Sequence, residues 1–182
     1  MKFTFTPMTI PEVILVEHER HGDARGSFAE LFREDAFREA GLPPFVQENL
    51  SRSQKDVIRG LHLQRPPMAI AKLVRCSRGR ILDVAVDLRR ASPTFKAHVA
   101  VELDEEGSRM LFVPIGFAHG FAVLSDFAEV QYKTSGYYSP AHEVTIRFDD
   151  PAISVPWPVL TPIVSARDAK APRLAELGEA PF

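Results

Sequence analysis

The sequence predicts an all-β domain, a sandwich or barrel of antiparallel strands, on two observations. First, seven short stretches alternate apolar and polar residues with period two or are rich in β-branched residues, as strands are. Second, turn signals of glycine, proline, serine and acidic residues separate these stretches at the spacing of antiparallel strands. We expect the strands at residues 13–16, 72–75, 81–88, 97–103, 110–113, 128–132 and 144–148.

Local signals predict the elements outside those strands. Residues 3–6 are extended, and we expect them to pair with the open sheet edge of a neighbouring subunit. A helix is expected at residues 33–40, because Gly41 follows it and two prolines then prevent its extension. A second short helix is expected near residues 168–177.

The C-terminal part, from about residue 151, is dense in proline and includes Pro156-Trp157-Pro158. Because proline cannot join a central ladder, we expect this tail to wrap the barrel as an extended edge and to carry side chains to the mouth of a cavity. The chain has 182 residues, 45% of them hydrophobic, and no internal repeat, so residues 1–182 are expected to form a single domain.

Composition narrows the possible partners. The net charge of -2 gives no general attraction to nucleic acid. The single cysteine, Cys76, allows neither an intramolecular disulfide nor a cysteine-rich zinc site, which fits a reducing compartment. The N-terminus lacks the apolar region of a signal peptide, and no later run is long enough to span a bilayer. These features predict a cytoplasmic protein without nucleic-acid or membrane partners.

Two histidine motifs carry the chemical signal. His62 alternates with apolar residues in Arg-Gly-Leu-His-Leu-Gln at residues 59–64, and His119 ends Pro-Ile-Gly-Phe-Ala-His at residues 114–119. Cupin barrels usually point imidazoles into their cavity in this way. A cupin metal centre needs several histidines and a glutamate, whereas Gln64 is a poor ligand and the ammonium of Lys72 repels a divalent cation. We therefore expect no metal and no other cofactor.

The ionisable residues around His62 favour proton transfer beside an anion. Arg59, Lys72 and Asp83 fall on the same or neighbouring strands, and such groups are costly to bury for packing alone. Tyr132 is expected to face inward, because the polar residues on either side of it share the opposite, solvated face of its strand. An inward phenol can donate a proton. Arginine beside glycine, as at Arg59 and Arg25, suits bidentate recognition of phosphate.

Several ordered blocks together resemble the dTDP-4-dehydrorhamnose 3,5-epimerase family. They lie at residues 23–28, 47–51, 58–62, 72–74, 83–89, 114–121, 132–134 and 149–158, nearly end to end. The resemblance implies a homodimeric double-stranded β-helix, a cupin-like jelly roll that needs no metal. It also implies action on a dTDP-linked 4-keto-6-deoxyhexose in dTDP-L-rhamnose biosynthesis.

The resemblance assigns roles to particular residues. His62 would be the base, Tyr132 the acid on the opposite face of the sugar, and Lys72 the support for an enolate. Asp168 would orient His62, although the sequence leaves Asp83 open as the carboxylate beside that imidazole. The nucleotide and diphosphate would be held by Arg25, Glu30, Gln47, Asn49, Arg59, His119, Glu143 and Arg167, with Tyr138 stacking on the base.

Other functions remain open at this point. A single-site epimerase, inverting carbon 3 or carbon 5 in an unusual deoxysugar pathway, would share every catalytic residue. A 3,4-ketoisomerase on the same barrel fits the motifs less well, and a metal oxygenase or a non-catalytic sugar-nucleotide binding module belongs to another class. Departures from the family pattern leave the substrate more open than the chemistry: Leu63 stands where an aromatic residue is common, Met68 and Ile70 where histidine and glutamine are, and Arg167 where lysine is.

Overall fold

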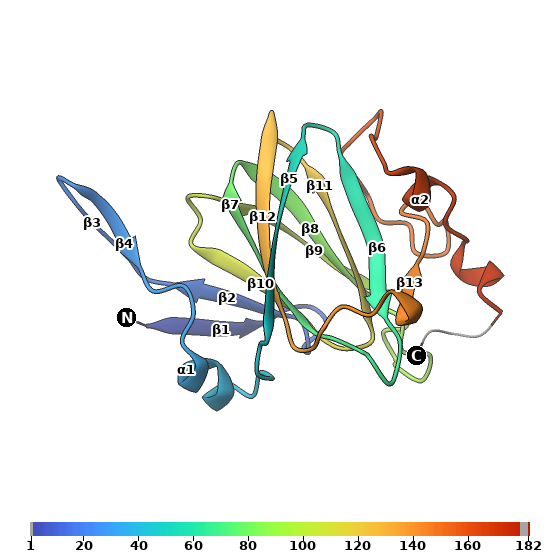
Figure 1. Ribbon diagram of the computed structural model, residues 1–182, viewed down its shortest axis with the longest axis horizontal. Helices are drawn as coiled ribbons and strands as arrows, with labels where there is room; N and C mark the ends of the chain where they lie inside the picture. Colours follow the sequence, from blue (N-terminus) through green and yellow to red (C-terminus); the bar gives the residue numbers. More distant parts are fainter. Residues whose placement is uncertain (1, 179–181) are drawn as a thin grey trace.

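Two β-sheets packed face to face form the body of the computed structural model, which describes residues 2–178 and 182 (Figure 1). Among these residues, one sheet has six strands in the order β1 (Phe3–Pro7), β2 (Ile14–His18), β10 (Arg109–Val113), β7 (Lys72–Arg78), β12 (Phe127–Thr134) and β5 (Gln47–Gln54). The other has five, in the order β13 (Glu143–Thr145), β6 (Ile58–Gln64), β11 (Phe117–Val123), β8 (Arg80–Asp87) and β9 (His98–Asp104). Adjacent strands within both sheets run antiparallel, so the predicted all-β class is confirmed.

The main hydrophobic core lies between the two sheets. Strands of both sheets contribute alternate residues to it, such as Val74 and Cys76 from β7 and Ile81 and Ala85 from β8. Because strand side chains alternate between faces, neighbours such as Leu82 and Val84 point to the outer face of their sheet. The core fills one part of the space between the sheets, and polar side chains of β5, β6 and β7 line the remainder.

The proline-rich tail packs over the outer face of the five-stranded sheet. Ile153 and Trp157 contact a second core formed by β6, β8 and β11, and the Trp157 Nε1–H donates to the Phe148 carbonyl at 2.8 Å. Ile163 then returns to the start of β6, where its carbonyl accepts from the Ile58 N–H at 3.0 Å. This return places helix α2 (Ala166–Ala169) beside β6.

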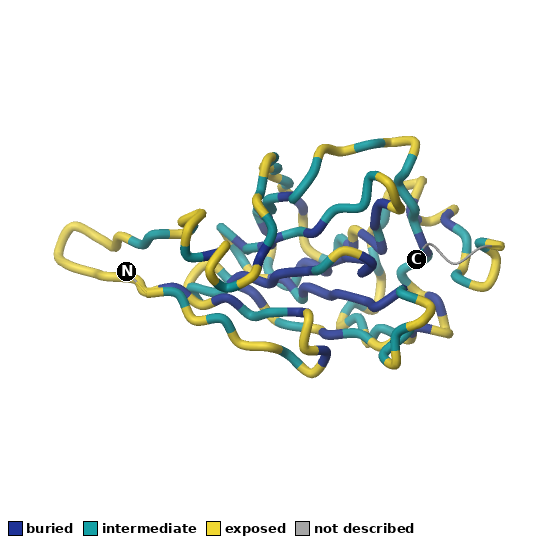
Figure 2. The backbone as a smooth tube through the Cα atoms, turned by 90° about the horizontal axis from the view of Figure 1, so that it is seen from below, coloured by how far each residue is buried: buried dark blue, intermediate teal, exposed yellow. Residues whose placement is uncertain are grey.

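Aromatic residues cover the outer face of the six-stranded sheet. Phe37, on helix α1 (Glu34–Glu39), is buried against Phe3, Phe5 and Phe32, with ring centroids 4.8 to 5.3 Å apart. This cluster fixes the segment that follows a two-stranded hairpin, β3 (Arg20–Asp23) and β4 (Gly26–Ala29). The hairpin projects from the barrel and is exposed along almost its whole length (Figure 2).

Some predicted elements differ from those observed. The second predicted helix is two separate turns, α2 and a 3-10 helix at Leu174–Glu176, because Pro172 cannot donate the backbone hydrogen bond that would join them. The strand predicted at residues 144–148 is shorter and shifted, at Glu143–Thr145. Strand β5, strand β11 and the β3–β4 hairpin were not predicted. Strand β1 pairs with β2 of the same chain, so its proposed pairing with another subunit would use its other edge.

No helix in residues 2–178 is long and apolar enough to cross a membrane.

Candidate active site

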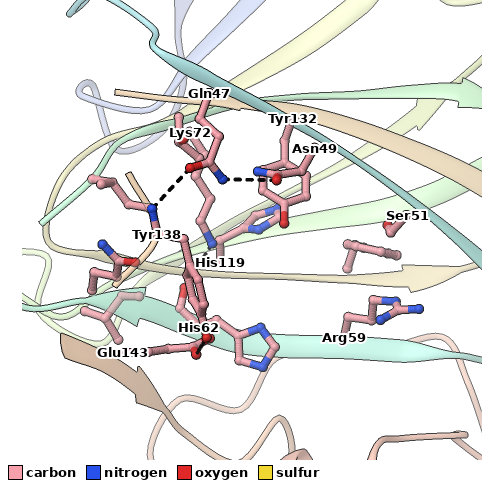
Figure 3. Close-up of a pocket in the computed structure, with 15 residues that line it drawn as sticks. Gln47, Asn49, Ser51, Arg59, His62, Lys72, His119, Tyr132, Tyr138 and Glu143 are labelled. Carbon is pink, nitrogen blue, oxygen red and sulfur yellow. Dashed lines mark hydrogen bonds between the residues drawn. The ribbon is translucent and has the colours of Figure 1, made fainter. Parts of the chain in front are cut away.

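A cavity of about 380 Å³ opens between the two sheets next to the main core, and Phe121 belongs to both (Figure 3). Strands β5, β7 and β12 form one wall, and β6, β11 and β13 form the other. The lining residues that could bind or react are Gln47, Asn49, Ser51, Arg59, His62, Gln64, Lys72, His119, Tyr132, Thr134, Tyr138 and Glu143. Most of the residues predicted from the sequence therefore meet in one place.

His62 and Asp168 form a hydrogen-bonded pair at the edge of this cavity. The His62 Nε2 lies 2.8 Å from Asp168 Oδ1, and the Asp168 side chain is 5% exposed. Ser165 caps helix α2 by accepting from the Asp168 N–H at 3.0 Å, which fixes the residue's backbone. Burial acts to raise the pKa of the Asp168 carboxyl. The hydrogen bond and charge of His62, together with hydrogen bonds from Gly60 and Ser165, outweigh burial and hold that pKa below its ordinary value. Of the two carboxylates that the sequence left open, Asp168 is the one beside His62.

Lys72 brings a cation into the interior of the cavity. Its Nζ donates to the His62 carbonyl at 3.3 Å and lies 6.0 Å from the centroid of the Tyr132 ring. Burial lowers the pKa of Lys72 to about 8, while the negative charges of Asp83 and Glu143 act in the opposite direction. Lys72 is therefore a cation at neutral pH that is poorly solvated, and it would strongly favour a neighbouring negative charge.

Tyr132 lies on the wall opposite His62. It comes from β12 in the six-stranded sheet, whereas His62 comes from β6 in the five-stranded sheet, and Figure 3 shows the two on opposite sides of the cavity. The prediction that Tyr132 faces inward is confirmed, since it packs against the inter-sheet core and lines the cavity. Burial raises the pKa of its phenol, so the hydroxyl keeps its proton at neutral pH.

His119 is held by the other carboxylate. Its Nε2 lies 2.8 Å from Oδ1 of Asp83, which is fully buried on β8. In the β11–β6 pairing His119 lies opposite His62, and the register shifts at the next residue, Gly120. Burial lowers the pKa of His119, so its imidazole is neutral at neutral pH.

Polar groups at the mouth of the cavity form a connected set. Glu143 accepts from the Tyr138 hydroxyl at 2.5 Å and pairs with Arg167 at 2.5 Å. On β5, Gln47 donates to Asn49 at 3.1 Å and accepts from the Tyr138 N–H at 3.2 Å. A second cavity of about 430 Å³ lies alongside, lined by Arg59, His62, Glu143, Arg167 and Asp168 among others.

Two predicted binding residues lie elsewhere. Arg25 is at the tip of the β3–β4 hairpin, where it pairs with Asp23 at 2.6 Å, and Glu30 follows that hairpin and lies 3.2 Å from Arg33. Neither residue lines the cavity of its own chain.

Ser51 and Thr134 line the cavity but were not predicted. Both lie within blocks that carry the family resemblance, at residues 47–51 and 132–134, but no role was assigned to either. Ser51 follows Gln47 and Asn49 at the spacing of one strand face, and that pattern was the available signal.

The cavity offers a metal ion few ligands. Within residues 2–178, no group of three or more histidine, cysteine, aspartate or glutamate side chains lies close enough to hold one. Gln64, at the position of a cupin ligand, instead uses its amide to tie loops together. It donates to the Met68 carbonyl at 2.6 Å and accepts from the Ser139 N–H at 2.7 Å.

Sequence comparison identifies the family. Residues 7–176 match a family model described as dTDP-4-dehydrorhamnose 3,5-epimerase. The chain belongs to the dTDP-4-dehydrorhamnose 3,5-epimerase family. A family member of that name from Salmonella typhimurium is 48% identical over 168 residues, which are 91% of this chain and 92% of the relative. A dTDP-4-dehydrorhamnose 3-epimerase from Streptomyces niveus is 40% identical over 176 residues, 96% of this chain and 85% of that one.

Solved structures of the epimerase family have the same fold. The dTDP-6-deoxy-D-glucose-3,5-epimerase of Legionella pneumophila, crystallised with dTDP-4-keto-L-rhamnose, superposes with a TM-score of 0.93 at 41% identity. The match covers 97% of this chain and 95% of that one. The predictions of a cupin-like jelly roll and of a carbohydrate epimerase, an isomerase, are both confirmed.

Proposed function

We propose that the chain inverts carbons 3 and 5 of dTDP-4-dehydro-6-deoxyglucose, in dTDP-L-rhamnose biosynthesis. The observation that carries this proposal is the placement of His62 and Tyr132 on opposite walls of one cavity, with the Lys72 ammonium near both. The family match supports the substrate, a dTDP-linked 4-keto sugar.

The residues have the properties that inversion beside a ketone requires. His62 takes the proton from the carbon next to the keto group, and the electron pair of the broken C–H bond moves to the keto oxygen as an enolate. The Lys72 ammonium stabilises that oxygen, because opposite charges attract strongly in a poorly hydrated site. Asp168 holds Nε2 of His62, so the proton goes to Nδ1, and its carboxylate stabilises the imidazolium that forms.

Reprotonation from the other face completes the inversion. The Tyr132 hydroxyl donates its proton to the carbon from the wall opposite His62. Carbons 3 and 5 both flank carbon 4, so the same enolate oxygen and the same ammonium serve both inversions. A single-site epimerase remains the second candidate, because the Streptomyces niveus relative is named for inversion at carbon 3 alone.

The mouth of the cavity suits a nucleoside diphosphate. Arg59 and Arg167 supply cations for the diphosphate, and Gln47, Asn49 and Glu143 supply polar groups around it. His119 lines the buried part of the cavity and offers a further polar group there. Tyr138, about half exposed at the mouth, can stack on the base. Arg59 is oriented by a hydrogen bond from its Nε to Ser53 at 2.9 Å.

We also propose a cytoplasmic homodimer. The exposed hairpin carries Arg25 and ends near Glu30, and both residues could reach a cavity only in another subunit. Phe28, 69% exposed on this hairpin, suits burial against a partner, and β1 has an outer edge that can extend a partner's sheet. The buried free thiol of Cys76 fits a reducing compartment.

Deuterium incorporation tests the proposal. The protein is incubated with the 4-keto sugar nucleotide in deuterium oxide, and the label in the product is counted by mass spectrometry. Two carbon-bound deuterons are expected, one at each inverted carbon. One deuteron would establish the single-site enzyme. None would contradict catalysis and favour a binding module.

A further inference from the structure

Asp83 is a buried carboxylate to which the proposed reaction gives no role. It is 0% exposed on β8, where it lies on the same strand face as Ile81 and Ala85 of the inter-sheet core. Its Oδ1 contacts His119 Nε2 at 2.8 Å, and its Oδ2 is buried without a hydrogen-bond partner among the described residues. An ionised carboxylate in such a place is costly unless a positive charge lies near it.

Lys72 is the cation that Asp83 can compensate. The titratable groups around Lys72 come from five strands: His62 on β6, His119 on β11, Tyr132 on β12, Asp83 on β8 and Glu143 on β13. Asp83 and Glu143 are the carboxylates in this set, and both raise the pKa of Lys72 against the effect of burial.

Glu143 and Asp83 differ in what already neutralises them. Glu143 is paired with Arg167 at 2.5 Å and also accepts from Tyr138, so a guanidinium shares its charge. Asp83 contacts His119, whose pKa is lowered by burial, so that contact brings no full positive charge at neutral pH. The charge of Asp83 is therefore the less compensated one near Lys72.

We propose that Asp83 is a positioning residue that keeps the Lys72 ammonium charged and holds His119 in one tautomer. The carboxylate supplies the counter-charge for a lysine whose only other carboxylate neighbour among the described residues, Glu143, already shares its charge with Arg167. It also accepts the Nε2–H of neutral His119, which leaves His119 Nδ1 as a hydrogen-bond acceptor. The inference deepens the proposed function, since it rests on Lys72 as the group that stabilises the enolate.

The pH dependence of kcat for Asp83→Asn tests this role. In the wild type, kcat should fall as pH rises through about 8, because Lys72 loses its proton there. Asparagine keeps the shape and the acceptor for His119 but removes the charge. The fall of kcat on the alkaline side of the pH profile, the alkaline limb, should therefore occur at a pH lower by about one unit or more, while dTDP affinity changes by less than about threefold. A uniform fall of kcat with an unmoved limb would mean a structural role only and would overturn the proposal.

Asp87→Asn is a matched control. Asp87 is also fully buried on the same face of β8, but Arg89, Ser92 and Thr94 hold its carboxylate, and it makes no hydrogen bond with His119. Its substitution can lower stability, but the alkaline limb should stay where it is. A limb that moved equally in both variants would contradict a specific pairing of Asp83 with Lys72.

A double-mutant cycle on melting temperature tests the same pairing without any turnover. Lys72→Met and Asp83→Asn each leave one buried charge without its opposite. The melting temperature of the double variant should therefore fall by less than the sum of the two single decreases. If Asp83→Asn alone does not fold, the double variant should fold. Additive losses, or a double variant that also fails to fold, would overturn the pairing. The two proposals can fail separately. If the melting temperatures show coupling but the wild type incorporates no deuterium, the epimerase function is disproved and the pairing of Asp83 with Lys72 stands.

Discussion

At the scale of single residues, two carboxylate–histidine pairs lie side by side and differ in their surroundings. His62–Asp168 is at the edge of the cavity and borders both cavities, whereas His119 and Asp83 are both buried. The sequence identified all four residues as candidates but left the pairing open, because residues 62 and 168 meet only through the return of the tail to β6. Chemistry could be predicted from residue types here, and geometry could not.

Asp168→Asn should lower kcat by about 10²- to 10⁴-fold, since asparagine can favour the wrong imidazole tautomer and cannot stabilise an imidazolium. The KM should change by less than about threefold, because Asp168 lies behind His62 and acts through it. Steady-state kinetics, with the melting temperature as control, check this. A loss confined to KM would show that Asp168 serves binding instead.

At the scale of elements, the position of β6 depends on a close approach between Gly60 and Gly120. A Cβ built on Gly60, whose φ is +143°, would lie 2.6 Å from the Gly120 Cα, which is backbone and cannot rotate away. The approach coincides with the register shift between β6 and β11, the strands that carry His62 and His119. Two glycines therefore set how the two imidazoles face the cavity.

Gly60→Ala should lower the free energy of unfolding by about 2–4 kcal/mol, the sum of overpacking and an unfavourable φ. Gly26→Ala is the control, because Gly26 has a φ of +129° but nothing within 4 Å of an added Cβ. The free energy of unfolding of that variant should fall by only about 1 kcal/mol, from the unfavourable φ alone. Urea denaturation measures both, and equal losses would contradict a role for the close approach.

Several elements with an apolar face were predicted well, although β11, which is buried along its whole length, was not among them. Strands β8 and β10 were found from their apolar and β-branched runs, and α1 from its terminal glycine and prolines. Strand β5 was missed because its cavity-facing residues, Gln47, Asn49 and Ser51, are polar, so it has no apolar alternation. A strand that lines a binding site loses the signal by which strands are recognised.

At the scale of the whole molecule, one chain supplies the reacting groups but not every predicted binding group. Arg25 and Glu30 lie on or next to a hairpin that extends away from the barrel (Figure 1). The sequence could name these residues by resemblance, but a single chain does not reveal which subunit's cavity they reach. Their distance from the cavity is the structural argument for the proposed dimer.

Complementation between inactive variants tests the shared site. Arg25→Ala and His62→Asn should each be nearly inactive, and a mixture of equal amounts, unfolded and refolded together, should recover about a quarter of wild-type activity. This is expected because about half of the dimers are mixed and each mixed dimer has one intact site. Separately refolded variants, combined afterwards, are the control. No recovery in the refolded mixture would place Arg25 in the cavity of its own chain.

The central claim is that His62 and Tyr132 act on opposite faces of the sugar. Tyr132→Phe in deuterium oxide tests it most directly, with His62→Asn as the control. We predict that Tyr132→Phe forms product about 10²-fold or more slowly, yet returns substrate that carries deuterium in its original configuration, because His62 still removes and returns a proton on its own face. His62→Asn should incorporate no deuterium into the substrate. Inverted product from Tyr132→Phe at the wild-type rate, or deuterium entering His62→Asn, would contradict the account.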